Sequence, residues 1–361
     1  MKKKKLVLIL PSLAGGGAEK VTLNLLENID KKYFDCTLFL INDVGPLKVN
    51  FNKYQIINFS SARLRNALPS ILAQIKNIQP DIILSTFPHI TIPIILIKKL
   101  LYNNIKVISR EPNMIDQSLG STNFSFLFKK LYKIIMPFSD KIIVSSKGMQ
   151  KDLYKKGIKK DKLTIIQNPI DIDLLRKINK FKRHPGSGLR LVSMGRLVYQ
   201  KGFDRILPII KNIKNAHITI LGEGKEYTNL SRIVEELNIK DKVSFKGFVH
   251  DPKKYIAAAD YFILPSRWEG LPNSVLESLA LGTPVITFTE IIGLMDIVPN
   301  VAEKKLILCK DERDMEILLK KLPIRSNNKD LKLRRNLLIK YNTPSDYSAH
   351  YFRVIEELLY E

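Results

Sequence analysis

The sequence predicts an α/β protein made of two Rossmann-like, doubly wound domains that face a central cleft. Two observations carry this prediction. Short apolar runs alternate with longer segments of helical periodicity along the chain, and unbroken apolar runs joined by helical crossovers are typical of parallel sheets covered on both faces. The chain is also long enough for two ordinary domains, with 361 residues.

The first domain is predicted over residues 1–178. The opening MKKKKLVLIL mimics a signal peptide, but its apolar run from Leu6 to Leu10 is shorter than the about 7–15 residues that such a peptide needs. It is therefore predicted to be the first strand. The other strand candidates of this half are 36–41, 81–85, 106–109, 141–146 and 163–166.

A linker is predicted over residues 179–188, because NKFKRHPGSG is rich in Pro, Gly, Ser and basic residues. The second domain is predicted over residues 189–345, and the final segment, 346–361, has apolar residues at helical spacing. Strand candidates of the second domain are 189–195, 217–222, 242–247, 260–265 and 283–288.

The composition is strongly basic, since 59 Lys and Arg against 35 Asp and Glu give a formal charge of +24. This balance favours anionic partners such as nucleic acid, an acidic membrane face or phosphorylated substrates, although a basic, soluble surface also explains it. Cys36 and Cys309 suggest neither a disulfide framework nor a metal site. The longest apolar stretch, 82–97, is broken by prolines and is too short to span a bilayer, so we expect a cytoplasmic protein without metal.

A glycine-rich turn follows the first predicted strand. Gly15, Gly16 and Gly17 open a predicted helix, where free backbone N–H groups favour an anion. A dinucleotide-binding fingerprint is a weak match, since it needs a third glycine where Lys20 stands. A bare structural turn is the alternative.

Two cations bracket the first loop of the second domain, in SMGRLVYQKG. Arg196 and Lys201 lie just before a predicted helix, where cations oppose the helix dipole unless an anion lies between them. Together with backbone N–H groups they suit a diphosphate. Solvated surface cations are the alternative.

Two further turns contain glycine at strand ends. Gly222 and Glu223 lie in LGEGKEY, and Gly247 and Phe248 follow the next strand. Their backbones could pass close to a nucleoside, although ordinary strand-to-helix turns explain each of them equally well.

The segment SRWEGLPNSVLESLALGTPVIT, 266–287, contains two glutamates and one cation. Ser274 and Glu277 fit the S-x-x-E pattern of a helix capping box, but that explanation leaves Glu269 and the following Gly270, Leu271 and Pro272 unexplained. Carboxylates accept hydrogen bonds from vicinal hydroxyls. Glutamates beside a phosphate-binding loop therefore indicate a site for a sugar nucleotide.

Taken together, GGGAE, GRLVYQKG, GEG, GF and EGLPNSVLESLALGTPVI resemble the family-four retaining glycosyltransferases, whose fold is called GT-B. The resemblance implies that Arg196 and Lys201 bind the donor diphosphate, that Glu277 binds the ribose and that Glu269 binds the transferred sugar. Gly270, Leu271 and Pro272 would lie along the donor, while Gly16 and Gly17 would close over its phosphates. It also implies that the final helix crosses back to the first domain.

The acceptor side departs from the family pattern. Many members carry a histidine where this chain has SREPN, so Arg110 and Glu111 are the candidates there. His89, in STFPHIT, is another acceptor-side candidate, although a lone histidine beside an apolar run is more often structural. Members also often carry two glycines and a glutamate where this chain has TEIIGLMDIVPN.

The resemblance implies transfer of a hexose or N-acetylhexosamine from a UDP- or GDP-linked sugar to a saccharide acceptor, with a lipid-linked acceptor fitting the positive charge. The helix-like segment 123–138 mixes aromatic residues with Lys129, Lys130 and Lys133, so it is a candidate for contact with an anionic membrane; a buried helix with solvated lysines is the alternative. Rival functions are a sugar-nucleotide epimerase, an NAD-dependent enzyme and a basic nucleic-acid-binding protein, although no nucleic-acid-binding motif is present.

Overall fold

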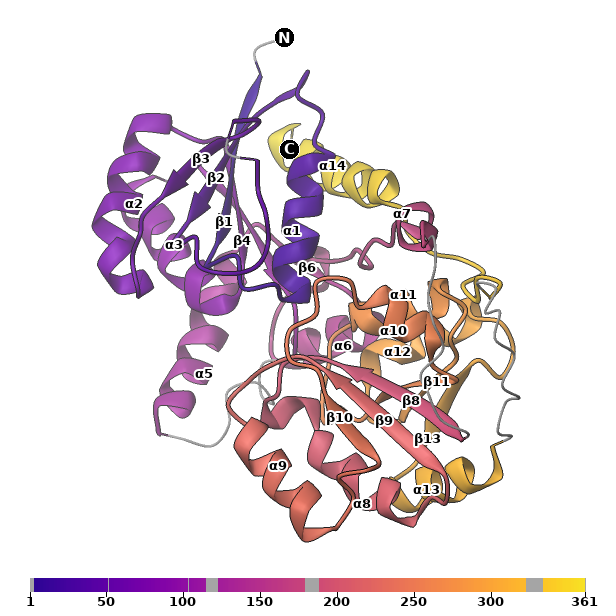
Figure 1. Ribbon diagram of the computed structural model, residues 1–361. Helices are drawn as coiled ribbons and strands as arrows, with labels where there is room; N and C mark the ends of the chain where they lie inside the picture. Colours follow the sequence, from indigo (N-terminus) through magenta and orange to yellow (C-terminus); the bar gives the residue numbers. More distant parts are fainter. Residues whose placement is uncertain are drawn as a thin grey trace. The chain divides into compact units, whose positions relative to one another are not determined.

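The computed structural model describes residues 3–50, 52–102, 104–114, 123–178, 188–322 and 334–360. The chain forms two compact units, one of Met1–Pro169 with Asn342–Glu361 and the other of Ile170–Tyr341 (Figure 1). Each unit has a parallel β-sheet flanked by helices, which confirms the predicted pair of Rossmann-like domains.

The sheet of the first unit has the strand order β3-β2-β1-β4-β5-β6-β7. Successive side chains point to opposite faces of a strand. In β1, Leu6, Leu8 and Leu10 therefore enter one core while Val7 and Ile9 enter the other. The strands are β1 (Lys4–Leu10), β2 (Phe34–Leu40), β3 (Gln55–Asn58), β4 (Ile82–Thr86), β5 (Lys106–Glu111), β6 (Lys141–Val144) and β7 (Leu163–Ile165).

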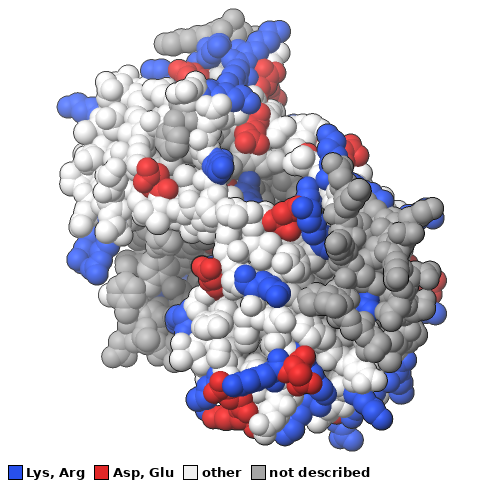
Figure 2. Space-filling model, viewed as in Figure 1, with Lys and Arg blue, Asp and Glu red and all other residues white. Residues whose placement is uncertain are grey.

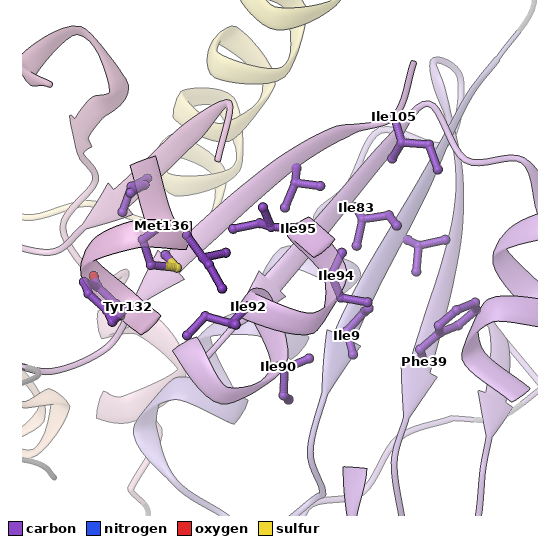
Figure 3. Close-up of a cluster of buried hydrophobic side chains, with 14 of the residues drawn as sticks. Ile9, Phe39, Ile83, Ile90, Ile92, Ile94, Ile95, Ile105, Tyr132 and Met136 are labelled. Carbon is purple, nitrogen blue, oxygen red and sulfur yellow. The ribbon is translucent and has the colours of Figure 1, made fainter. Parts of the chain in front are cut away.

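One face of this sheet is covered by α2 (Leu64–Ile78), α3 (Pro88–Leu101), α5 (Asn123–Ile135) and α6 (Lys147–Lys155). Ile94 and Ile95 of α3 pack toward the strands at Ile83, as Figure 3 shows. The other face is covered by α1 (Gly17–Glu27) and the final helix, α14 (Pro344–Tyr360). Buried tyrosines of α14 secure the end of the chain to the first unit.

The sheet of the second unit has the order β10-β9-β8-β11-β12-β13. Its strands are β8 (Leu189–Met194), β9 (Ala216–Leu221), β10 (Val243–Phe245), β11 (Tyr261–Leu264), β12 (Val285–Phe288) and β13 (Leu306–Cys309). One face packs against α8 (Phe203–Asn212), α9 (Tyr227–Glu236) and α13 (Glu312–Lys321). The other packs against α7 (Ile172–Arg176), α10 (Lys253–Ala258), α11 (Asn273–Ala280) and α12 (Ile292–Met295).

The structure divides the chain earlier than residue 178. Ile170 and Ile172 are buried in the core of the second unit, and Arg176 donates a hydrogen bond of 2.9 Å to the Ala280 carbonyl. These contacts attach α7 to α11, so residues 170–178 belong to the second unit. Of the predicted linker, residues 179–187 lie outside the described residues. At the other end, α14 starts two residues before the predicted 346, and the first unit resumes at Asn342.

Two strands were not predicted, β3 and β13, and each lies at an edge of its sheet. Both are four residues long and only partly buried, so their sequences lack the long apolar run of a central strand. No helix in the described ranges combines the length and apolarity needed to cross a membrane.

Candidate active site

Apart from Gly16 and Gly17, the predicted donor-binding residues follow the carboxyl ends of strands in the second unit. Strand β8 pairs with β9 on one side and with β11 on the other, so the connections that follow β8 and β11 diverge to opposite sides of the sheet. In open parallel sheets this switch point is where ligands bind. The loop after β8 contains Arg196 and Lys201, and the loop after β11 contains Glu269.

The loop after β8 is held close to the loop after β11. It ends in a short 3-10 helix, η3 (Tyr199–Lys201), and then at Gly202, whose φ of +62° is in the left-handed region. A Cβ at Gly202 would lie 2.2 Å from the Pro265 carbonyl oxygen, so only glycine fits there. The side chain of Arg196, in the same loop, is exposed.

Lys201 and Glu269 are in direct contact. The Lys201 Nζ lies 2.5 Å from the Glu269 Oε1, and the Ser266 hydroxyl donates a 2.8 Å hydrogen bond to the same oxygen. The Glu269 side chain is 7% exposed and that of Lys201 17%. The structure therefore brings together a phosphate-binding candidate and a sugar-binding candidate that lie 68 residues apart in sequence.

Two other side chains tie the same loops together. Gln200 donates to the Trp268 carbonyl at 3.0 Å, while Arg267 forms a double hydrogen bond with Asp204 at 2.8 and 2.6 Å. Burial alone would raise the pKa of Asp204, but the hydrogen bonds and charge of Arg267 outweigh it and hold that pKa below its usual value. These contacts fix the positions of Lys201 and Glu269 relative to each other.

Gly270, Leu271 and Pro272 are buried in the loop that leads into α11. The backbone at Gly293, near the start of α12, packs directly against this loop, because a Cβ at Gly293 would lie only 1.5 Å from the Gly270 oxygen. The segment TEIIGLMDIVPN, which departs from the family pattern, therefore supports residues 269–272, the EGLP loop, through a backbone contact at Gly293.

The capping-box explanation of Glu277 is wrong. Helix α11 starts at Asn273, its N-cap residue is Pro272, and Ser274 lies inside the helix. Glu277 is half-buried in the second turn rather than the first, two residues beyond the third helical position that a capping box requires. Helix capping therefore does not explain why a glutamate stands at position 277.

The turns at Gly222 and Gly247 form a bridge between β9 and β10. The Gly222 N–H donates to the Gly247 carbonyl at 2.7 Å, and the exposed Glu223 accepts a 3.1 Å bond from the Phe248 N–H. A Cβ at Gly222 would lie 2.0 Å from the Gly195 oxygen, which explains this glycine by packing. Phe248 is exposed and packs edge-on against His250.

In the first unit, Gly16 is the N-cap residue of α1 and Gly17 is its first residue. The carboxylate of Glu19 folds back over this turn, since a Cβ at Gly16 would lie 2.3 Å from the Glu19 Oε2. His89 is exposed at the start of α3, and its ring lies beside that of Phe87. The backbone of Phe87 has a φ of +80°. These residues follow β1 and β4, which are neighbouring strands.

Arg110 and Glu111 point to opposite faces of the sheet, as neighbours in a strand must. Arg110 is buried on the α14 side and donates a 2.8 Å bond to Asn168. Glu111 is buried on the α3 side and accepts a 2.9 Å bond from Ser109. Burial raises the pKa of Glu111 to about 7, although Ser109 and the charges of Arg110 and Lys156 act in the opposite direction.

Sequence reasoning missed several residues of the second-unit site: Gln200, Ser266 and Gly293. Only Ser266 carried a signal, because it precedes Glu269 by three residues in the same loop. Across the described ranges, no group of three or more His, Cys, Asp or Glu side chains is arranged to hold a metal ion.

Comparison with known proteins gives two family matches that together span most of the chain. Residues 15–174 match glycosyltransferase family 4, and residues 176–337 match the glycosyl transferases of group 1. An uncharacterised glycosyltransferase of Haemophilus influenzae is 26% identical over 337 residues, covering 89% of this chain and 90% of that protein.

Two further similarities concern named proteins. The N-acetylgalactosamine-N,N'-diacetylbacillosaminyl-diphospho-undecaprenol 4-alpha-N-acetylgalactosaminyltransferase of Campylobacter jejuni is 28% identical over 297 residues, which cover 78% of this chain and 80% of that enzyme. The crystal structure of Anabaena Alr3699/HepE in complex with UDP and glucose superposes with a TM-score of 0.77 at 14% identity, covering 98% of this chain and 100% of that one. The matching models, the paired parallel sheets and the loops at the β8–β11 switch point lead to one conclusion: the chain is a group 1 glycosyltransferase of family 4, with the GT-B fold.

Proposed function

We propose that this glycosyltransferase moves a hexose or N-acetylhexosamine from a UDP- or GDP-linked sugar to a lipid-linked saccharide, with retention of anomeric configuration and without a metal ion. The observation that supports this most is the contact between Lys201 and Glu269 at the switch point of the second sheet. It supports the proposal because a cation suited to a phosphate and a carboxylate suited to a sugar hydroxyl lie within hydrogen-bonding distance of each other.

The donor would insert where these side chains meet. Lys201 and the exposed Arg196 would take the diphosphate, Glu269 would accept hydrogen bonds from sugar hydroxyls, and Glu277 would accept them from the ribose. Backbone along Gly270, Leu271 and Pro272 would line the donor. Gly222, Glu223, Gly247 and Phe248 would border the base, while Gly16 and Gly17 would serve the phosphates from the first unit.

In the transfer itself, the bond between the anomeric carbon and the diphosphate oxygen breaks, and a bond to the acceptor oxygen forms on the same face. The acceptor proton passes to the departing phosphate, so that a nucleoside diphosphate is released. Lys201 and Arg196 neutralise the charge that develops on this leaving group, which is electrostatic stabilisation of the transition state. His89, Arg110 and Glu111 are proposed for the acceptor side, where Arg110 and Glu111 would act from beneath the surface because both are buried.

The nature of the acceptor is suggested by the relatives. The Campylobacter jejuni enzyme is named for a diphospho-undecaprenol acceptor, and an Escherichia coli relative, 27% identical over 292 residues, is named as an O-antigen biosynthesis glycosyltransferase. A polyprenyl-diphosphate saccharide would bring this protein to the anionic cytoplasmic face of a membrane, as a peripheral enzyme of surface-polysaccharide synthesis.

Two measurements test the proposal. A thermal-shift screen of nucleoside diphosphates and their sugars should show stabilisation by one base, and Lys201→Ala should abolish that shift. The selected donor is then supplied with lipid-linked saccharides, with and without EDTA, and the product anomer is assigned by NMR. A product with inverted anomeric configuration would refute retention, and loss of activity with EDTA would refute transfer without a metal ion. An isomerised free nucleotide sugar without acceptor would instead indicate an epimerase.

A further inference from the structure

An apolar strip with basic flanks lies on the outer side of α3 and α5 in the first unit. Its apolar members are exposed: Leu96, Leu100 and Leu101 of α3, Phe126, Leu127, Leu131 and Ile134 of α5, and Phe138 of the following 3-10 helix η1 (Met136–Phe138). Leu100 is 78% exposed and Phe126 is 73% exposed. Water contact at so many large side chains on two adjacent helices is unusual for a surface with no partner.

The two helices are packed together and attached to the sheet by their other sides. Ile94 and Ile95 of α3 and Tyr132 of α5 are buried in the same core, as Figure 3 shows. The exposed leucines therefore lie on the outer side of well-packed helices. They are carried on helices whose inner faces already have their full packing, so the strip has a fixed shape.

The charged side chains of α3, α5 and η1 are all lysines, and Asp140, just after η1, pairs with Lys98 of α3. Lys130 and Lys133 are exposed on α5, and the Lys99 Nζ lies 2.9 Å from the centroid of the Phe138 ring. No Asp or Glu occurs in residues 82–110 or 117–139. On the face that Figure 2 shows, Lys and Arg lie at several separate places, so positive charge alone does not mark the strip. The combination with exposed apolar side chains does.

We infer that this strip, which we name the α3–α5 strip, inserts into the headgroup region of an anionic lipid bilayer. An interfacial helix of this kind buries its apolar side chains at the acyl boundary while its lysines meet anionic headgroups. A second copy of the chain suits the strip less well, because two such surfaces would bring their exposed lysines together, while α3, α5 and η1 contain no carboxylate and the nearby Asp140 is already paired with Lys98. The inference rests on the proposed function only for its biological purpose, which is access to a lipid-linked acceptor.

The experiment is co-sedimentation of the full chain with vesicles of phosphatidylglycerol and phosphatidylcholine in equal amounts, against vesicles of phosphatidylcholine alone. The double variant Lys130→Gln/Lys133→Gln should lower the partition coefficient about 25-fold, since each basic residue near an anionic surface contributes about fivefold. Leu100→Glu/Leu127→Glu should lower it at least about tenfold, and raised salt should not restore it.

Matched controls lie elsewhere on the first unit. Lys151→Gln/Lys155→Gln removes two exposed lysines from α6, and Val44→Glu changes an exposed apolar residue outside the strip. These variants should bind vesicles as the unaltered protein does. Equal losses in the control and strip variants would overturn the inference, and so would a lack of binding to anionic vesicles at low salt. Self-association that depends on Leu100 and Leu127, without vesicle binding, would overturn it in favour of a second copy.

The outcome is separable from that of the proposed function. Vesicle binding needs no donor or acceptor, and nucleotide binding by thermal shift needs no vesicle. With a water-soluble saccharide acceptor, the strip variants should keep the transfer rate of the unaltered protein.

Discussion

The Lys201 ammonium and the Glu269 carboxylate lie 2.5 Å apart, across the two loops that diverge from the switch point of the second sheet. Each side chain is the other's charge partner. The proposed donor would have to share or replace this contact, so its binding would depend on the local structure of both loops.

Variants of Lys201 and Glu269 should distinguish the effect of the ion pair on stability from its effect on activity. Lys201→Met should lower kcat/KM about 10²–10³-fold, because a cation at the leaving group is lost. It should also destabilise the protein by about 2 kcal/mol, because Glu269 is left buried without its cation. The double variant Lys201→Met/Glu269→Gln should recover most of the stability in urea unfolding but none of the activity. Recovery of both would show that the pair is only structural.

Ser266 should act through Glu269. Its hydroxyl is fully buried and holds the carboxylate oxygen that Lys201 also contacts. Ser266→Ala should therefore lower kcat/KM about tenfold, with a loss of stability of about 1 kcal/mol. Ser193→Ala is the matched control, since Ser193 is equally buried and donates to the Ile263 carbonyl at 2.7 Å in the same sheet. A similar stability loss with unchanged KM for the donor is expected there.

Gly293 should tolerate no side chain. A Cβ would meet the Gly270 oxygen at 1.5 Å, far inside contact distance, so Gly293→Ala must displace the EGLP loop or α12. We expect the thermal shift induced by the donor nucleotide to disappear and the free energy of unfolding to fall by about 1–3 kcal/mol. Ile292→Ala is the control, because Ile292 is adjacent and exposed. Donor binding by Gly293→Ala equal to that of the control would contradict this account.

Glu111 should make the stability of the protein depend on pH. Its pKa is raised to about 7 in the fold from an ordinary value of 4.5, so the folded state holds a proton that the unfolded state releases. The neutral form favours folding. Stability should then be highest below about pH 4.5 as far as this group is concerned, and should fall on the order of 3 kcal/mol as pH rises through 7.

The variant Glu111→Gln mimics the neutral form and provides the comparison. The difference in its free energy of unfolding from that of the unaltered protein should grow in favour of the variant between pH 5 and about pH 8. Urea unfolding at several pH values measures this. A difference that does not change with pH would mean that Glu111 is ionised throughout.

Much of the fold followed from the sequence because local patterns are sufficient for it. Central strands such as β1 and β11 are buried on both faces, so their unbroken apolar runs identify them without tertiary information. The edge strands β3 and β13 are short and partly exposed. LILC is wholly apolar, so β13 did carry a strand signal in the sequence. QIIN has only two apolar residues in a row. The unit boundary was placed late for a similar reason, since only contacts with α11 assign α7 to the second unit.

The sequence by itself determined the chemical types in the proposed donor site, because glycines, cations and carboxylates occur there within single loops at the spacing of the family's motifs. Only the tertiary structure decided which of them meet. Lys201 reaches Glu269 because β8 and β11 are neighbours in the sheet, and Gly293 supports Gly270 through contact of their backbones. Arg110 and Glu111, although adjacent in sequence, point to opposite faces of a strand. Proximity in a folded chain depends on strand order and backbone packing, which no local pattern of residues encodes.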